Sequence, residues 1–123
     1  MKTWKRFEHV NAKTVEEAAS ILQTGKAAAI SGGTDLLGAM RFEILPNYPE
    51  VVVNLKTIPG LDSIREEGGV LKIGALTRLE DIAKSDLIRT KYAALAEGAH
   101  RTATPHIREM GSIAGNICQM NRC

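Results

Sequence analysis

The sequence predicts an α/β fold whose character changes midway, and three observations carry this prediction. Short apolar segments alternate with helical patterns over roughly the first 55 residues, which is typical of a small βαβ unit. VVVNL, residues 51–55, is β-branched and uniformly apolar, which predicts a strand buried on both faces. From Pro59 onward a glycine-centred hairpin pattern replaces the alternation. We therefore expect an α/β chain, α+β overall, with an N-terminal α/β part over residues 1–57 and a second part over residues 58–123.

The first part is expected to begin with a short strand at residues 7–10, which Asn11 ends. Thr14 and Glu17 have the spacing of a capping box and predict a helix. Gly25 is suited to close that helix, because glycine readily adopts the left-handed conformation that follows a helix. This spacing gives the strand-then-helix order of an α/β unit.

A second buried strand is predicted at AAAI, residues 27–30, and it runs directly into the loop SGGTD. Thr34 or Asp35 is expected to cap a short helix through Met40. The strand at residues 51–55 then completes a β-α-β-loop-α-β order.

The second part opens with LDSIREEGGVLKIGAL, which reads as two strands around a turn at Gly68 and Gly69. Thr77 and Glu80 form a second capping box, which predicts a helix through Ala83. A further helical pattern covers residues 87–96 and is expected to end at Gly98. The remaining residues show no helical period, so we expect a loop and then a short strand around Ile113.

Composition excludes several classes of protein. The chain has 123 residues, 44% of them hydrophobic and 24% charged, so it can form a core and is not compositionally disordered. A net charge of +2 and an aromatic content of 4% argue against a nucleic-acid binder or a base-stacking platform. No apolar run approaches the roughly 20 residues of a membrane span, and no secretory leader opens the chain. These features favour a cytoplasmic protein.

The loop SGGTD has the chemistry of an anion site. Gly32 and Gly33 lack Cβ atoms and allow a ligand to approach the main chain, while Ser31 and Thr34 add hydroxyl donors. Asp35 suits a helix cap or an acceptor for a sugar hydroxyl better than a phosphate neighbour. The loop lacks the GxGxxG spacing of dinucleotide folds, so by itself it is better explained as an ordinary strand-to-helix turn.

A second loop of small residues, GSIAGN at residues 111–116, strengthens the binding interpretation. It again combines glycines with a hydroxyl and an amide. Two such loops can grip one long ligand from two sides, an arrangement that an ordinary globular domain seldom needs.

Three motifs in this order, ISGGTDLLGAM, KIGALTRLEDI and ATPHIREMGSIAGN, make the chain resemble the FAD-binding subunit or domain of molybdenum hydroxylases. This group includes xanthine dehydrogenases, carbon monoxide dehydrogenases and 4-hydroxybenzoyl-CoA reductases. The resemblance implies the vanillyl-alcohol-oxidase (PCMH-type) FAD-binding fold, with the first α/β subdomain followed by the start of the second. It also implies an N-terminal fragment of a longer subunit, inactive on its own.

The resemblance further implies the cofactor contacts. The first loop would wrap the FAD pyrophosphate, Thr77 of the motif IGA-x-T would lie near the flavin, and the segment from Ala103 to Asn116 would hold the cofactor from a second side. The implied FAD-binding residues are Ile30, Ser31, Gly32, Gly33, Thr34, Asp35, Leu36, Leu37, Thr77, Ala103, Gly111, Ser112, Ile113, Ala114, Gly115 and Asn116.

By the same resemblance, the chain is an oxidoreductase component that relays electrons from iron–sulfur clusters through FAD to an external acceptor. Its partners would be a molybdopterin-binding subunit and an iron–sulfur subunit, and no side chain is expected to be catalytic. A competing interpretation is a truncated module that binds nucleotide weakly or not at all and serves as an assembly surface.

Cys118 and Cys123 are most simply unrelated thiols, with Cys118 expected to be partly buried. One branch of the family carries an additional four-iron cluster on this subunit, and there Cys123 would be a first ligand. Four thiolates are normally required, so this chain alone would not hold such a cluster. His100, Arg101 and His106 are expected to be solvated loop residues, and Arg108 to support the loop.

Overall fold

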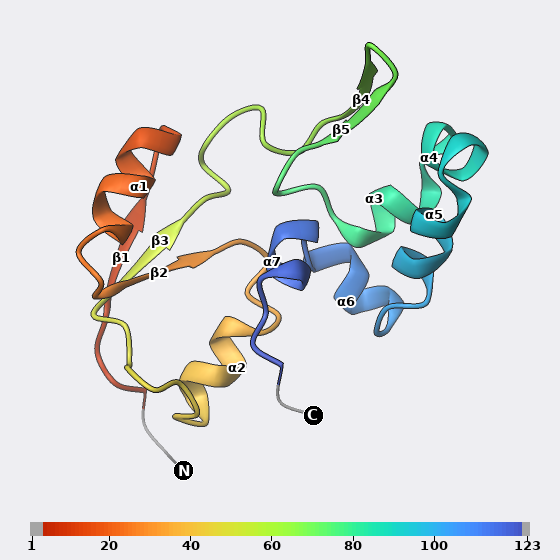
Figure 1. Ribbon diagram of the computed structural model, residues 1–123. Helices are drawn as coiled ribbons and strands as arrows, with labels where there is room; N and C mark the ends of the chain where they lie inside the picture. The colour runs from red at the N-terminus through yellow and green to blue at the C-terminus, as the bar shows by residue number, and fades with distance from the viewer. Residues whose placement is uncertain (1–3, 122–123) are drawn as a thin grey trace. The chain divides into compact units, whose positions relative to one another are not determined.

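The computed structural model describes residues 4–121 (Figure 1). The chain divides into two compact units, Met1–Pro59 and Gly60–Cys123. Each unit has its own sheet and its own buried apolar cluster. The predicted α/β architecture is confirmed. Within the part of the chain that the structure describes, no helix has the length and apolarity needed to cross a membrane.

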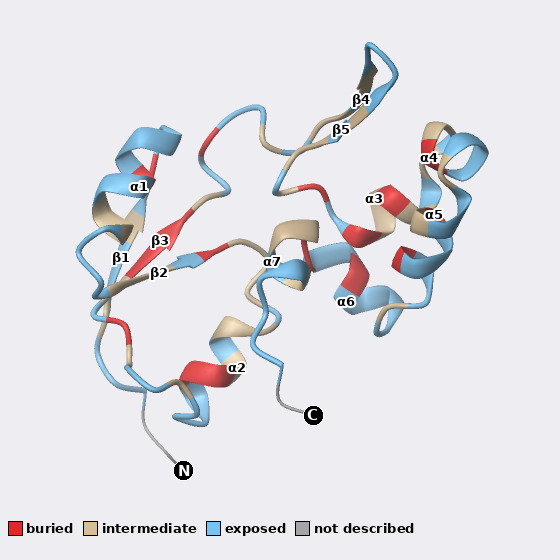
Figure 2. Cartoon of the chain, in the orientation of Figure 1, coloured by how far each residue is buried: buried red, intermediate tan, exposed pale blue. Residues whose placement is uncertain are grey.

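The first unit is a three-stranded parallel sheet with helices in its connections. In chain order it contains β1 (Glu8–Asn11), α1 (Val15–Leu22), β2 (Ala27–Ile30), α2 (Leu36–Arg41) and β3 (Val51–Asn54). The strand order is β1-β3-β2, and both outer strands run parallel to β3. Because β3 is central, Val52 and Val53 are almost fully buried, as their apolar run predicts (Figure 2).

The register aligns the carboxyl ends of the three strands. Asn54 of β3 is paired with Asn11 on one side and with Ile30 on the other. The loops that follow these strands therefore leave the sheet at the same edge. In open parallel sheets this is the edge where ligands bind.

Local sequence explains the elements of this unit. The Thr14 hydroxyl accepts a hydrogen bond from the Glu17 N–H at 3.1 Å and caps α1, as predicted. The Glu17 carboxylate in turn accepts from the N–H of Lys13 at 2.8 Å, so the reciprocal bond falls one residue before the cap. Gly25 has φ +75° and follows the C-cap residue Gln23 by two positions, rather than directly. The core comprises Ile30, Met40 and Val52, with Phe7, Leu36, Leu45 and Tyr48 packed against them.

The second unit combines a β-hairpin with short helices. Its elements are β4 (Ile64–Glu67), β5 (Val70–Ile73), α3 (Leu79–Lys84), α4 (Asp86–Lys91), α5 (Ala93–His100), α6 (Pro105–Met110) and α7 (Ile113–Ile117). The hairpin turns through Gly68 and Gly69, whose φ angles are +57° and +76°, the geometry of a two-residue type I′ turn. The core of this unit comprises Ile82, Ile88, Ala96 and Ala99 of the helices, and the hairpin packs Ile64, Leu71 and Ile73 against them.

Three predicted details of residues 77–98 are wrong. Thr77 is not the N-cap of α3, because Arg78 takes that position and the Thr77 side chain is buried. The single helix expected over residues 87–96 is broken at Tyr92, with φ −132° and ψ 48°, into α4 and α5, and Gly98 lies inside α5. Ile88 of α4 and Ala96 of α5 lie in the same core cluster, so the apolar residues that suggested one helix belong to two helices packed together.

The C-terminal residues form α6 and α7, where the sequence suggested a loop and a strand around Ile113. Helices of six and five residues are too short to display a helical period. Their start signals are present: the Thr104 hydroxyl accepts from the Ile107 N–H at 3.4 Å, and Pro105 occupies the first turn of α6. Extended structure near this point is limited to an isolated bridge between Arg78 and Ser112.

Candidate functional site

The glycine loop that follows β2 requires glycine at one position for two reasons. Gly33 has φ +76°, a conformation that residues with a side chain rarely adopt. A Cβ at this position would also lie 3.1 Å from Cδ1 of Leu37 and 3.3 Å from Cδ1 of Ile30. The main chain therefore turns tightly from the end of the sheet into α2, and the Leu37 N–H donates to the Gly33 carbonyl at 3.3 Å.

The same loop presents a row of backbone donors. Among residues 4–121, the N–H groups of Gly32, Gly33 and Thr34 donate to no main-chain carbonyl. Thr34 is exposed and the glycines are half-buried. Successive N–H groups without main-chain acceptors can together bind an anion. The loop thus has the property that a diphosphate ligand requires.

The helix that follows adds little to this surface. Asp35 occupies the N-cap position of α2, as expected, but its side chain makes no capping hydrogen bond. The helix has only six residues, so its dipole is small. Leu36 is half-buried against the core of the unit, and Leu37 is 39% exposed. Anion binding here depends on the loop.

A lysine that sequence reasoning did not single out lies beside this loop. The Lys56 Nζ donates to the Ser31 carbonyl at 2.7 Å. Partial burial lowers the pKa of the Lys56 ammonium below its ordinary value. The available signal was positional: Lys56 comes two residues after the central strand, at the edge where the glycine loop emerges.

The second and third sequence motifs lie side by side in the second unit. The Ile113 N–H donates to the Thr77 carbonyl at 2.9 Å, and the Ala114 N–H donates to the Ala75 carbonyl at 3.1 Å. The Leu79 N–H donates to the Gly111 carbonyl at 3.0 Å. These three bonds join KIGALTRLEDI to ATPHIREMGSIAGN, and each links residues more than 30 positions apart in the chain. The structure therefore brings together two of the three motifs on which the family resemblance rests.

The glycine of IGA-x-T is required by a close approach of two backbones. A Cβ at Gly74 would lie 2.3 Å from the carbonyl oxygen of Leu61. That oxygen accepts from the Leu76 N–H at 2.7 Å, and the Gly74 N–H donates to the Ser63 carbonyl at 2.8 Å. Gly74 thus fixes the path of the segment that carries Thr77.

Two hydroxyls expected at the cofactor are used inside the fold. Thr77 is 1% exposed, and its hydroxyl donates to the Ser63 carbonyl at 3.5 Å. Ser112 is 2% exposed, and its hydroxyl caps α7 by accepting from the Gly115 N–H at 3.3 Å. Gly115 is exposed, and Ala114 and Asn116 are half-buried. At the start of α7, the residues open to a ligand are therefore small residues and an amide, while the last residue of the helix, Ile117, exposes an apolar side chain.

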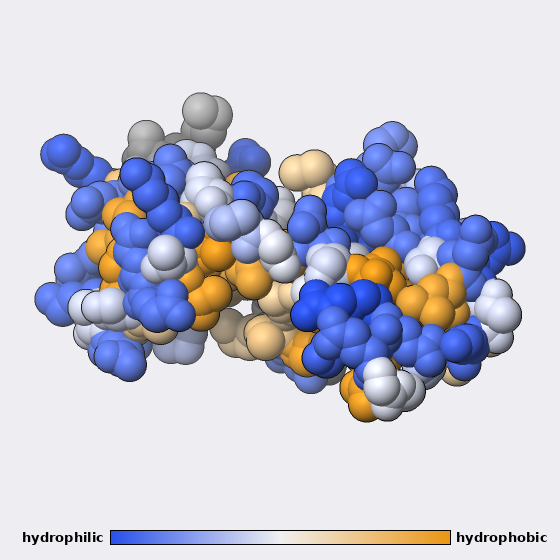
Figure 3. Space-filling model, turned by 90° about the horizontal axis from the view of Figure 1, so that it is seen from above, coloured by the Kyte–Doolittle hydropathy of each residue, from blue (hydrophilic) through white to orange (hydrophobic). Residues whose placement is uncertain are grey.

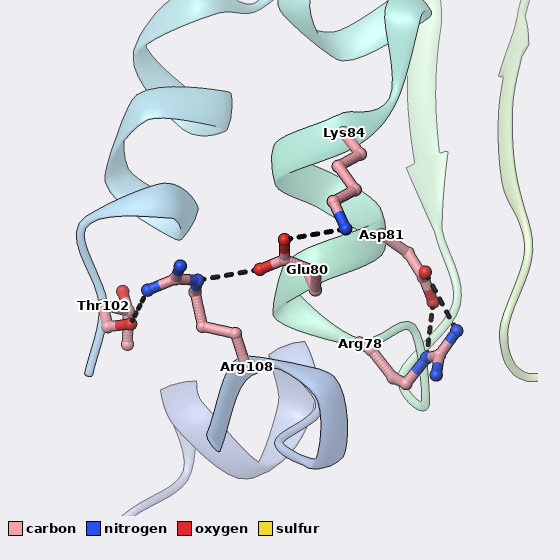
Figure 4. A network of polar contacts seen from close by, with 6 residues as sticks. All are labelled: Arg78, Glu80, Asp81, Lys84, Thr102 and Arg108. Atoms are coloured by element: carbon pink, nitrogen blue, oxygen red, sulfur yellow. Dashed lines mark hydrogen bonds and ion pairs between the residues drawn. The ribbon is translucent and has the colours of Figure 1, made fainter. Parts of the chain in front are cut away.

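A buried ion pair supports the turn that precedes α6 (Figure 4). The Arg108 Nε donates to the Glu80 carboxylate at 2.8 Å, and these side chains are only 7% and 12% exposed. The Arg108 Nη1 donates to the carbonyls of Thr102 and Ala103 at 3.1 and 3.4 Å. Ala103 has φ +49°, so the guanidinium stabilises a turn in which a residue with a side chain adopts a strained conformation.

The Glu80 carboxylate is held ionised by two cations. Hydrogen bonds from Arg108, and then from Lys84, lower the pKa of Glu80 below its ordinary value. Lys84 is 3.0 Å away but 69% exposed, so Arg108 is the dominant partner (Figure 4). Sequence reasoning assigned loop support to Arg108. It missed Glu80 as the partner, because 28 positions separate the two residues.

The remaining candidates do not form a reactive cluster. His100, Arg101 and His106 are exposed as expected, but His100 lies in α5 and His106 in α6 rather than in loops. Arg101 pairs with Glu97 within one helix turn. Within residues 4–121 no group of three or more His, Cys, Asp or Glu side chains could hold a metal ion. Cys118 is exposed, contrary to the expectation of partial burial, and Cys123 lies outside the described residues.

Comparisons with known proteins agree with these features. Residues 5–123 match the family described as the FAD binding domain in molybdopterin dehydrogenase. The carbon monoxide dehydrogenase medium chain of Hydrogenophaga pseudoflava is 38% identical over 114 residues, which are 91% of this chain and 39% of that protein. The nicotinate dehydrogenase FAD-subunit of Eubacterium barkeri is 37% identical over 118 residues, 92% of this chain and 38% of that protein.

Solved structures lead to the same family. The fold matches the Hydrogenophaga pseudoflava carbon monoxide dehydrogenase that lacks the Mo-pyranopterin moiety of the molybdenum cofactor. The TM-score is 0.87 at 35% identity, and the match covers 94% of this chain and 40% of the solved chain. The chain thus spans about two-fifths of the length of these relatives.

Proposed function

Because this chain belongs to the family of FAD binding domains in molybdopterin dehydrogenases, we propose that it binds FAD and serves as the flavin-carrying part of a molybdenum hydroxylase. The observation that carries the proposal is the row of N–H donors at Gly32, Gly33 and Thr34, at the carboxyl edge of the parallel sheet. These donors can hydrogen-bond the oxygens of a diphosphate through the main chain alone.

The residues present fit FAD in two ways. The loop Ile30–Leu37 offers backbone donors and a cradle at Gly33 that a Cβ would crowd. In the second segment, Thr77, Gly111 and Ser112 are buried and fix the backbone, while Ala114, Gly115 and Asn116 are half-buried or exposed and can face a ligand. Ala103 and Arg108 contribute by shaping the turn that leads into this segment.

FAD, when bound, would take up electrons from iron–sulfur clusters and pass them to an external acceptor. The chain's own contribution is binding and orientation. Its backbone donors hold an anion, and the buried Arg108–Glu80 pair keeps the second segment in a fixed conformation. No described side chain in either segment has the arrangement of a general acid, a general base or a nucleophile, so we assign no catalytic residue.

We assign two partners to the complete oxidoreductase: a molybdopterin-binding subunit and an iron–sulfur subunit. Figure 3 shows hydrophobic residues at the surface among hydrophilic ones. Large exposed apolar residues include Phe42, Met110 and Ile117, which are 67%, 57% and 72% exposed. The names of the relatives, a medium chain and an FAD-subunit, support this assignment, because both describe one subunit of a larger enzyme. We place the protein in the cytoplasm and expect this chain alone to be inactive in catalysis.

Fluorescence titration of FAD into the purified chain tests the proposal. The wild type should bind FAD saturably and release it to excess ADP. Gly33→Ala should weaken FAD binding by more than about tenfold, since the substitution strains the donor loop. Gly25→Ala is the matched control, because Gly25 has almost the same φ, +75°, with open space around it and no place in either segment.

Two outcomes would contradict the proposal. Equal affinities for FAD in the Gly33→Ala and Gly25→Ala variants would remove the glycine loop from the site. A wild type that is folded by circular dichroism and binds neither FAD nor ADP would instead favour the assembly-module interpretation.

A further inference from the structure

Lys56 occupies a position that the fold determines closely. The Leu55 N–H donates to the Ile30 carbonyl at 3.0 Å, which extends the pairing of β3 with β2 by one residue. The Lys56 N–H donates to the Asn54 side-chain oxygen at 3.1 Å. Asn54 is 9% exposed, and its amide donates to the Asn11 side-chain oxygen at 2.8 Å. A buried amide on the central strand therefore fixes the backbone from which the lysine side chain departs.

The Lys56 side chain reaches back to the first residue of the glycine loop. Its Nζ donates to the Ser31 carbonyl at 2.7 Å, across 25 positions of sequence. An ammonium group carries three donors, and this bond uses one of them. Its position is therefore anchored while two donors remain for another acceptor.

The charge of Lys56 is not neutralised within the described part of the fold. Other lysines, such as Lys5, Lys26 and Lys72, form ion pairs with a glutamate. Lys56 forms no ion pair with any carboxylate of residues 4–121. Burial lowers its pKa with no opposing contribution from a neighbouring acid. A cation that is partly desolvated and lacks a counter-charge is stabilised by an anionic ligand.

We propose that Lys56 is a positioning residue of the FAD site, which anchors the glycine loop through the Ser31 carbonyl and supplies the positive charge beside a diphosphate. The inference rests on the proposed function and extends it, since neither the loop motif nor the second segment includes this lysine. The backbone donors of Gly32, Gly33 and Thr34 carry no net charge. Lys56 provides the net charge that they lack.

The test compares three variants for binding FAD, ADP and riboflavin at several ionic strengths. Lys56→Met removes the charge and retains a side chain of similar length, while Lys56→Arg retains the charge. Lys26→Met is the matched control, because Lys26 precedes β2 at the opposite edge and pairs with Glu50 at 3.5 Å. Circular dichroism checks that each variant is folded.

Lys56→Met should weaken FAD and ADP binding about tenfold, near the lower limit for a charge-assisted hydrogen bond because the side chain is largely exposed. Its dependence of log Kd on log salt should be shallower than that of the wild type, since one fewer cation faces the ligand. Riboflavin, which has no phosphate, should bind all variants equally. Lys56→Arg and Lys26→Met should keep the salt dependence of the wild type.

The outcomes separate this inference from the proposed function. If Lys56→Met loses FAD and riboflavin affinity equally with an unchanged salt dependence, the lysine is merely structural and the inference is overturned. Unchanged FAD binding by Lys56→Met overturns it as well. A folded wild type that binds no FAD overturns the proposed function, and this inference with it.

Discussion

Gly74→Ala is the substitution whose effect on stability follows most directly from the structure. The new Cβ would lie 2.3 Å from the Leu61 carbonyl oxygen and 2.5 Å from its carbonyl carbon, whereas real Cβ contacts essentially never fall below 3.0 Å. Both neighbours are backbone atoms, so no side chain can rotate away. The two segments must separate by roughly 0.7 Å or more, an overpacking displacement that carries a cost of about 1–3 kcal/mol.

The separation also weakens two hydrogen bonds. The Leu76 N–H donates to the Leu61 carbonyl at 2.7 Å, and the Gly74 N–H donates to the Ser63 carbonyl at 2.8 Å. Each such bond contributes on the order of 1 kcal/mol net. Alanine offsets about 0.5–1 kcal/mol of this loss in stability, because it restricts the conformations of the unfolded chain. We therefore expect Gly74→Ala to lower the free energy of unfolding by about 2–4 kcal/mol.

Gly98→Ala is the matched control for the same chemical change. Gly98 lies inside α5, and a Cβ there would have nothing within 4 Å. It should raise the free energy of unfolding by about 0.5–1 kcal/mol, because alanine is the better helix former. Urea unfolding followed by far-ultraviolet circular dichroism measures both. Equal midpoints for Gly74→Ala and the wild type would refute the close approach of the Leu61 and Gly74 backbones.

Three further predictions concern the second unit. Arg108→Met should lower the free energy of unfolding by about 3 kcal/mol, because it leaves the buried Glu80 carboxylate without its main partner. Lys84→Met, which removes the exposed partner of the same carboxylate, should lower it by less than about 0.5 kcal/mol. Similar urea midpoints for the two variants would contradict this. The pKa of Glu80 is lower in the folded state than its ordinary 4.5, so this carboxylate stabilises the fold above about pH 4.5 and ceases to do so as the pH falls through the folded pKa. In thermal unfolding between pH 5 and about pH 3, the Glu80→Gln variant should therefore lose less stability than the wild type. Parallel curves of stability against pH for the two proteins would argue against the ion pair. Ser112→Ala removes the cap of α7 and should lower the free energy of unfolding by about 1 kcal/mol. It should also increase the hydrogen-exchange rate of the Gly115 amide, and an unchanged rate would contradict the role of Ser112 as a cap.

Elements marked by strong local signals could be predicted from the sequence. The helix cap at Thr14, the glycine hairpin at Gly68 and Gly69, and the buried strand predicted at residues 51–55 each have one local cause. The structure confirms all three, with the strand at Val51–Asn54. The same rule failed at Thr77 because a tertiary contact competes with it. Its hydroxyl is directed to the Ser63 carbonyl, and Glu80 pairs with Arg108 instead of completing a capping box.

The candidate site divides in the same way. The glycines that allow tight turns or close approach are visible in the sequence, since only glycine serves at Gly33 and Gly74. The partners that complete the site depend on long-range pairing. Lys56 reaches Ser31, and Arg108 reaches Glu80, only because strands and helices far apart in the chain are packed together. No periodicity or spacing rule reports such contacts.

The most direct test of the central claim is a titration of the isotope-labelled chain with FAD, followed by amide chemical shifts. The account predicts saturable shifts at Gly32, Gly33 and Thr34 and in the segment Gly111–Asn116, with ADP reproducing only those of the first loop. Saturable shifts confined to other residues, or none in a folded chain, would contradict the claim that each of these segments binds FAD.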